Sequence, residues 1–81
     1  MKSKKQIYEE TQDMVLKTNT DNYMEYLKTY RQAFNSNITQ EEKDDIRKKA
    51  YEEYLKKENE LYDILAHAYM DYIHDANPIF A

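Results

Sequence analysis

The chain has 81 residues with a net charge of −4, and it contains no cysteine, no glycine and a single proline. The lack of cysteine excludes disulfides and cysteine-ligated zinc, and the lack of glycine excludes the phosphate-binding loops of kinase-like and Rossmann proteins. With one valine and no glycine for tight turns, the composition predicts an all-α protein. We expect a single helical domain, residues 1–81, whose core is marginal at this length.

The first predicted helix covers residues 4–17. Ser3 is a suitable N-cap, and Ile7, Thr11, Met14 and Val15 recur at the spacing of one buried stripe. Five polar residues follow, Thr18-Asn19-Thr20-Asp21-Asn22. Short polar side chains of this kind compete with the helix backbone for hydrogen bonds, so we predict a turn over residues 18–22.

The second predicted helix covers residues 21–34 and is the most aromatic stretch of the chain. Tyr23, Leu27, Tyr30 and Phe34 recur at i, i+4, i+7 and i+11, as one helical face requires. The run Asn35-Ser36-Asn37 favours a turn over a helix, so this helix is expected to end at residue 34.

The third predicted helix covers residues 40–76 and begins at a capping box formed by Thr39 and Glu42. Two apolar lines lie side by side on it. The first consists of Ile46, Ala50, Tyr54, Leu61, Leu65, Ala68 and Tyr72. The second consists of Tyr51, Leu55, Tyr62, Tyr69 and Ile73. The apolar pattern lapses over residues 56–60, so this segment is either an exposed part of one long helix or a break between two.

Two architectures fit these elements. In a small bundle of three helices, the two short helices form a hairpin that packs on the long C-terminal one. In an extended hairpin, residues 4–34 form one bent rod antiparallel to residues 40–76. We favour the three-helix bundle, because residues 18–22 have the composition of a true turn.

No apolar run approaches the roughly 18 residues that span a bilayer. The N-terminal Met-Lys-Ser-Lys-Lys-Gln also lacks the apolar segment of a signal peptide. These features predict a soluble, cytoplasmic protein that does not insert into a membrane.

Charge is distributed unevenly along the chain. The last third, from residue 58 onwards, has five acids and no Lys or Arg; these are Glu58, Glu60, Asp63, Asp71 and Asp75. Helical geometry places most of them on the side away from the first apolar line. Carboxylates one turn apart lie about 5–6 Å from each other, a spacing comparable to that of phosphates along one nucleic-acid strand. An acidic stripe of this kind fits a basic groove that binds nucleic acid.

Tyrosine is the other abundant interface residue, with nine copies in the chain. Its large apolar area, polar tip and few rotamers suit a binding surface. We therefore expect a partner protein to contact Tyr26, Tyr62 and Tyr69 together with the five acids of the last third.

Metal binding and catalysis are less well supported by the sequence than binding to a partner protein. His67, Asp71 and His74 fall at i, i+4 and i+7, with Asp63 nearby, a spacing that is compatible with a divalent metal. Exposed ion-pair partners explain the same residues more simply, so no metal or other cofactor is expected. No activated nucleophile or converging carboxylate pair is present, and the protein is not expected to be an enzyme.

The leading interpretation is a small acidic binding protein without catalysis. It would inhibit or regulate a partner protein by occupying that partner's basic, nucleic-acid-binding surface, as the nucleic-acid mimics of phages and mobile elements do. It would not bind nucleic acid directly. The alternative is a homo-oligomeric structural or scaffolding protein whose long helix pairs with its own copy, in the simplest case a homodimer. A metal-binding helical protein is a third, weaker alternative.

Overall fold

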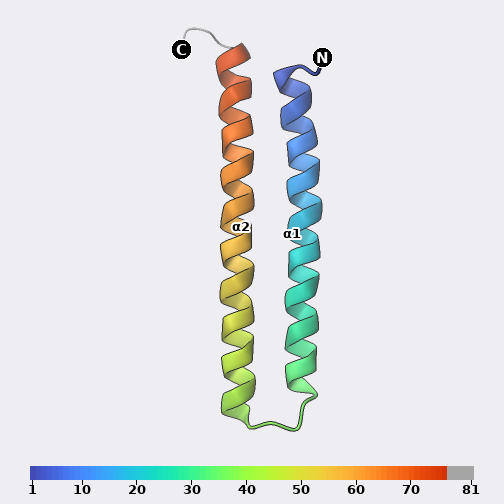
Figure 1. The fold of residues 1–81 in the computed structure, drawn as a ribbon, viewed down its shortest axis with the longest axis vertical. Helices are drawn as coiled ribbons and strands as arrows, with labels where there is room; N and C mark the ends of the chain where they lie inside the picture. The colour runs from blue at the N-terminus through green and yellow to red at the C-terminus, as the bar shows by residue number, and fades with distance from the viewer. Residues whose placement is uncertain (77–81) are drawn as a thin grey trace.

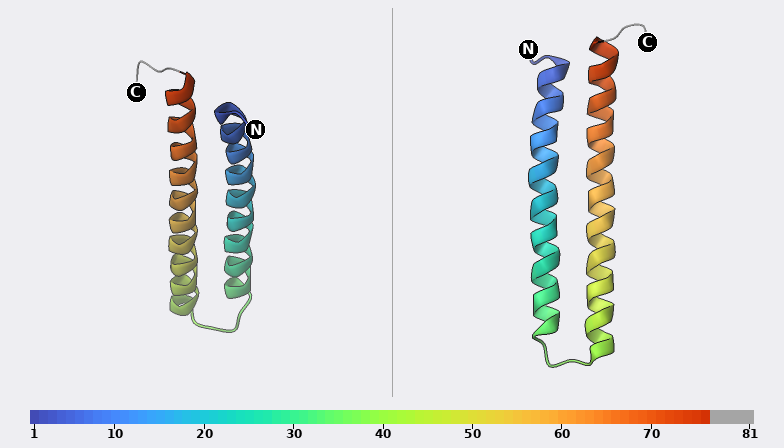
Figure 2. Two further views of the ribbon diagram at one scale, coloured as in Figure 1. Left: turned by 45° about the horizontal axis from the view of Figure 1, so that its top comes forward. Right: turned by 180° about the vertical axis from the view of Figure 1, so that it is seen from behind.

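The computed structural model describes residues 1–76 and shows two long helices packed side by side (Figure 1). Helix α1 runs from Lys4 to Phe34 and helix α2 from Gln40 to Ala76. The pair forms a rod with principal dimensions of 59 × 21 × 12 Å. Both ends of the described chain lie at one end of the rod, and the connection over residues 35–39 lies at the other (Figure 2).

The all-α prediction is confirmed, but the preferred three-helix count is wrong. The predicted turn at residues 18–22 is part of the uninterrupted helix α1. Thr20 donates its hydroxyl hydrogen to the Leu16 carbonyl at 2.9 Å, and Asn19 donates its amide to Glu58 of α2 at 3.3 Å. These bonds pair the Thr20 hydroxyl and the Asn19 amide hydrogen without opening the helix. The extended hairpin, the architecture we ranked second, is the one observed.

The helix ends predicted at residues 4, 34, 40 and 76 agree with the structure, whereas those predicted at residues 17 and 21 are absent because α1 is continuous there. Ser3 accepts from the Gln6 N–H at 3.1 Å and the Gln6 side chain accepts from the Ser3 N–H at 2.9 Å, which completes a capping box. Asn35 is the C-cap of α1. Thr39 accepts from the Glu42 N–H at 3.1 Å, while the Glu42 carboxylate bonds the Thr39 hydroxyl rather than its N–H.

Helix α2 is continuous through residues 56–60, so no break occurs where the apolar pattern lapses. Lys57 and Glu58 are half-buried there and turned toward α1. The Glu58 carboxylate accepts from Tyr54 at 2.8 Å as well as from Asn19. A polar stretch on α2 is therefore matched by a polar stretch on α1, and the helix needs no kink.

The two helices keep one antiparallel register along their length. Tyr8 packs on Tyr69 and Tyr72 near the termini, Asn19 bonds Glu58 at mid-length, and Tyr26 packs on Tyr51 nearer the connection. Residues whose numbers sum to about 77 thus lie at the same level of the rod. The residues of α1 turned toward α2 follow three- and four-residue steps, as in antiparallel helix pairs.

The contact between the helices is thin. Among the described side chains, only Val15, Ala33 and Leu61 are less than 9% exposed. Of the predicted first stripe, Val15 is buried and Thr11 half-buried, whereas Ile7 and Met14 are exposed. Within residues 1–76, no helix is long and apolar enough to cross a membrane.

Candidate protein-binding faces

One broad face of the rod is lined with apolar side chains from both helices, and we call it the tyrosine face. Its members in α1 are Leu16, Tyr23, Leu27, Tyr30 and Phe34. Its members in α2 are Tyr51, Leu55, Tyr62, Tyr69 and Ile73. Tyr23, Leu27 and Tyr30 line one open groove together with Tyr51 of the facing helix. Tyr62 and Tyr69 line a second groove with Tyr8, so both helices contribute to the same face.

Most of the tyrosine face is open to solvent. Leu16 is 70% exposed, Phe34 66% and Tyr62 52%. These side chains follow the heptad-like steps of a helix-bundle core, yet the two-helix rod has nothing to cover them. The second apolar line predicted for α2 is therefore a surface line rather than part of the core.

Stacked tyrosines give the tyrosine face a rigid base. Tyr26 lies half-buried between the helices, with its ring centroid 5.7 Å from that of Tyr51 and 6.1 Å from those of Tyr23 and Tyr54. Aromatic pairs at these distances are favourable. Of the three tyrosines predicted to bind a partner, Tyr26 thus supports the face from below, while Tyr62 and Tyr69 are exposed on it.

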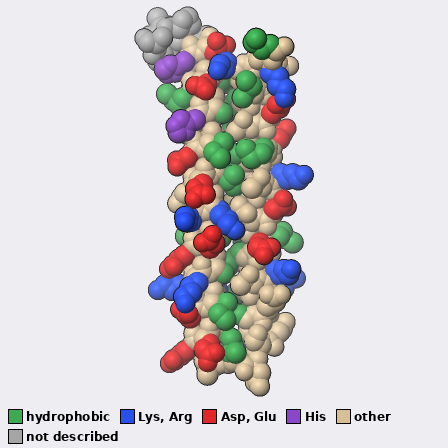
Figure 3. All heavy atoms as spheres, viewed as in Figure 1, with side chains coloured by type: hydrophobic (Ala, Val, Ile, Leu, Met, Phe, Trp, Pro, Cys, Tyr) green, Lys and Arg blue, Asp and Glu red, His purple; other side chains and the backbone are tan. Residues whose placement is uncertain are grey.

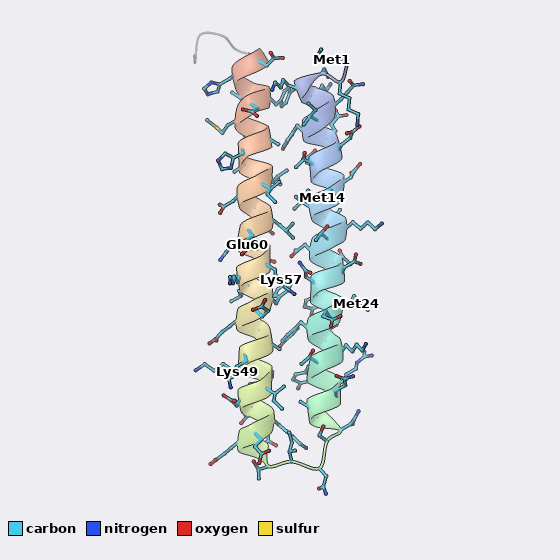
Figure 4. The ribbon with its side chains drawn as sticks, viewed as in Figure 1. Met1, Met14, Met24, Lys49, Lys57 and Glu60 are labelled. Atoms are coloured by element: carbon cyan, nitrogen blue, oxygen red, sulfur yellow. The ribbon has the colours of Figure 1, made fainter. Side chains whose placement is uncertain are left out.

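The predicted acids lie elsewhere on the rod. We call Glu60, Asp63, Asp71 and Asp75 the acidic stripe; all four are exposed. At about 100° per residue, Glu60 and Asp71 lie nearly in line along α2. The two histidines lie along the outer edge of α2 (Figure 3), and Glu60 lies on the outer side while Lys57 is turned toward α1 (Figure 4). The fifth acid, Glu58, is half-buried between the helices and does not belong to the stripe.

Glu60, Asp71 and Asp75 lie on the far side of α2 from Tyr62 and Tyr69, whereas Asp63, the neighbour of Tyr62, lies only about 100° from it and borders the tyrosine face. Tyr62 and Asp71 are nine residues apart, which corresponds to about 180° around a helix. Tyr69 and Asp71 differ by two residues, or about 200°. The structure therefore separates most of the residues that we expected to act together, and one flat partner surface that contacts Tyr62 and Tyr69 does not reach Glu60 or Asp71.

The acidic stripe lacks the ion pairs of the neighbouring segment of α2. Asp45 and Lys49 lie 2.9 Å apart, and the hydrogen bond to Asp45 followed by its charge raises the pKa of Lys49. Within residues 1–76, no member of the acidic stripe lies within 4.0 Å of a Lys or Arg nitrogen. The negative charge of the stripe is thus uncompensated by close cations.

A small polar cluster lies at mid-length, where Tyr54 and Asn19 both donate to Glu58. The hydrogen bond to Glu58 is the main cause that raises the pKa of Tyr54 above its ordinary value of 10.0, and partial burial adds to it. The Asn19 side-chain oxygen is buried without a hydrogen-bond partner. Polar groups of this kind favour one helix register over others.

Tyr54 is expected to ionise at a pH above its ordinary pKa value of 10.0. Because its folded pKa is raised, its contribution to stability is complete below pH about 10 and is lost as pH rises through the folded pKa. Absorbance titration of tyrosinate should show one late-titrating group that disappears in Tyr54→Phe. Loss of a different tyrosine, as in Tyr62→Phe, should leave that late group in place; if it removes it instead, the assignment to Tyr54 is wrong.

The histidines do not converge on a metal. The His67 ring donates from Nδ1 to the Asp63 carbonyl at 2.7 Å, so the ring is bonded to its own helix. In the part of the chain that the structure describes, no group of three or more His, Asp or Glu side chains is arranged to hold a metal ion. The spacing of His67, Asp71 and His74 is therefore that of a solvent-facing helix side.

Leu16 is a member of the tyrosine face that the sequence analysis missed. It lies seven residues before Tyr23, which continues the line of Tyr23, Leu27, Tyr30 and Phe34 toward the N-terminus. The expected turn at residues 18–22 hid this periodicity, because a line of side chains does not continue across a turn. The seven-residue step was the available signal.

Comparison with known protein families, with curated proteins and with solved structures finds no match for this chain.

Proposed function

We propose that this chain is a non-catalytic binding protein that presents its acidic stripe to the basic surface of a partner protein. The observation that carries the proposal is the segregation of charge: Glu60, Asp63, Asp71 and Asp75 project from one helix with no close Lys or Arg. Exposed helix faces usually alternate acidic and basic side chains. An uncompensated stripe suits a partner that supplies the cations.

The partner class follows from the dimensions of the stripe. From Glu60 to Asp75 the helix rises by about 22 Å, or about four helical turns. Basic grooves that bind nucleic acid are lined with Lys and Arg side chains, which contact a row of negatively charged phosphates. The protein therefore acts as an inhibitor or regulator that competes with nucleic acid for such a groove, with affinity that falls as salt is added.

The tyrosines are assigned a separate role from the acids, because most of the acidic stripe lies on the far side of α2 from them. The alternative function, a homo-oligomeric structural protein, rests on the tyrosine face alone. It is compatible with an acidic stripe that remains exposed to solvent in the oligomer.

Charge reversal tests the proposal. The triple variant Asp63→Lys, Asp71→Lys, Asp75→Lys is expected to lose capture of a nucleic-acid-binding protein from lysate of the source cells. Exposed ion pairs contribute roughly 0.2–1 kcal/mol each, so affinity for the captured protein should fall roughly 3- to 150-fold. Duplex DNA added to the wild-type complex should release the partner.

The matched control reverses three exposed acids in the charge-balanced part of α2, Asp45→Lys, Glu52→Lys and Glu53→Lys. It has the same net charge as the test variant, so a general effect of charge would act on both. Equal losses in the two variants, or a complex that duplex DNA does not displace, would contradict the proposal.

A further inference from the structure

The tyrosine face exposes large apolar side chains along most of the rod, among them Leu16, Tyr62 and Phe34. The rod is 59 Å long and 21 Å wide, so its broad side has room for the roughly 800 Å² that each partner buries in a stable interface. Monomeric proteins rarely expose apolar patches above a few hundred Å². The buried contact between α1 and α2 is small, with three side chains less than 9% exposed among those described. A covering layer would add the apolar burial that the contact between the two helices lacks.

The charge distribution identifies the occupant of this face as a second copy. Glu60, Asp71 and Asp75 lie about 120° or more around α2 from Tyr62 and Tyr69, so two tyrosine faces can meet without bringing these three acids together, while Asp63 lies at the border of the face. Glu58 is half-buried between the helices and already accepts from Tyr54 and Asn19. Arg47 lines the groove of Tyr23, Tyr30 and Tyr51, and Asp44 lies seven residues before Tyr51 on the same line of α2. A mainly apolar face that has charges of both signs can contact a second copy of itself without net repulsion.

The spacing of the exposed side chains fits a bundle of four helices. Leu16, Tyr23, Leu27, Tyr30 and Phe34 follow steps of seven, four, three and four residues along α1. Such steps place one line of side chains in the core of antiparallel helix bundles. We propose that two hairpins stack through their tyrosine faces as an antiparallel homodimer.

Charge at the two ends of the rod sets the antiparallel direction. The half of the rod nearest the termini, residues 1–19 and 58–76, has eight acids and four lysines, a net charge of −4. The half nearest the connection, residues 20–57, has eight acids and eight bases, a net charge of zero. A parallel stack brings the two negative ends together, whereas an antiparallel stack with two-fold symmetry separates them.

Two neighbouring residues of α2 provide a matched test of the interface. Tyr62 is 52% exposed on the tyrosine face, and Ile64 is 48% exposed on the other side of the helix. In sedimentation equilibrium, wild type is expected to be a dimer, Tyr62→Asp to weaken dimerisation at least about 30-fold, and Ile64→Asp to change it less than about threefold. Leu16 is 70% exposed, so Leu16→Lys removes little of the contact between α1 and α2. It should weaken dimerisation about as much as Tyr62→Asp does.

A wild-type chain that remains monomeric at about 200 μM would overturn the proposal, since stable interfaces of this area bind far more tightly. Equal effects of Tyr62→Asp and Ile64→Asp on the dimer, or the absence of any effect of Leu16→Lys, would also overturn it. These outcomes do not depend on the acidic stripe, so they are independent of the proposed partner.

Disulfide trapping tests the direction of the stack. Lys5 and Phe34 are 29 residues apart on α1, about 44 Å along a helix, so cysteines at these positions cannot bond within one chain. Since the natural sequence has no cysteine, the double variant Lys5→Cys, Phe34→Cys should oxidise to a linked dimer only if the two copies run antiparallel. Adding Tyr62→Asp should abolish the linkage; a linkage that persists, or none in the double variant, would overturn the antiparallel arrangement.

Discussion

Replacing Asp21 with proline is expected to lower the free energy of unfolding by about 3 kcal/mol or more. Asp21 lies in the interior of the continuous helix α1, which spans residues 4–34. Proline there removes the bond from the residue 21 N–H to the Lys17 carbonyl, and its ring clashes with that carbonyl. A domain of this size rarely has more than about 3–5 kcal/mol of stability, so the variant should lose most of its helical circular dichroism at 25 °C.

The same substitution separates the hairpin from the three-helix bundle. If a turn existed at residues 18–22, proline at the start of the next helix would be tolerated, because the first helical N–H has no partner. Lys4→Pro is the matched control, since Lys4 is the first residue of α1 after the Ser3 N-cap. Lys4→Pro should retain the wild-type urea midpoint, and a similar midpoint for Asp21→Pro would argue against a continuous α1.

The ends of the helices could be predicted because they depend on local chemistry. The side chains of Ser3 and Thr39 each accept from a backbone N–H three residues later, which requires only residues close in sequence. The bounds of residues 40–76 were predicted for the same reason. Local rules also indicated that the chain is helical throughout.

The course of α1 through residues 18–22 could not be predicted, because it depends on a contact 39 residues away. Asn19 is compatible with the helix since Glu58 accepts its amide, and the lapse in the apolar pattern of α2 is the other half of this pairing. Each polar stretch alone favours a turn or a break. Only the antiparallel register makes them partners.

The sequence identified candidate binding residues but not how they are arranged on the rod. The acids beyond residue 57 and the exposed tyrosines were both identified from the sequence. The angle between Tyr62 and Asp71 follows from their nine-residue spacing on one helix, so it could have been predicted; which flank of α2 is covered depends on where α1 packs and could not. Glu58 illustrates this dependence: its sequence position groups it with the stripe, yet the structure places it between the helices.

Truncation of Leu61 is expected to be the most damaging apolar substitution. Leu61 is 8% exposed and lies at the level of Val15, the other large buried side chain of the described hairpin. Leu→Ala changes in protein cores cost about 2–5 kcal/mol. A loss of this size approaches the whole stability of a small domain, so Leu61→Ala should be largely unfolded in dilute solution, as measured by urea titration followed by circular dichroism.

Ile64→Ala is the control, because Ile64 lies three residues later in the same helix and is 48% exposed. Its unfolding free energy should change by less than about 1 kcal/mol. If the hairpin is a dimer, raising protein concentration should shift the Leu61→Ala midpoint upward, since association favours the folded chain. A midpoint independent of concentration in both wild type and Leu61→Ala would mean that the hairpin is stable without a second copy. Equal losses for Leu61→Ala and Ile64→Ala would mean that the contact between α1 and α2 does not hold the fold together.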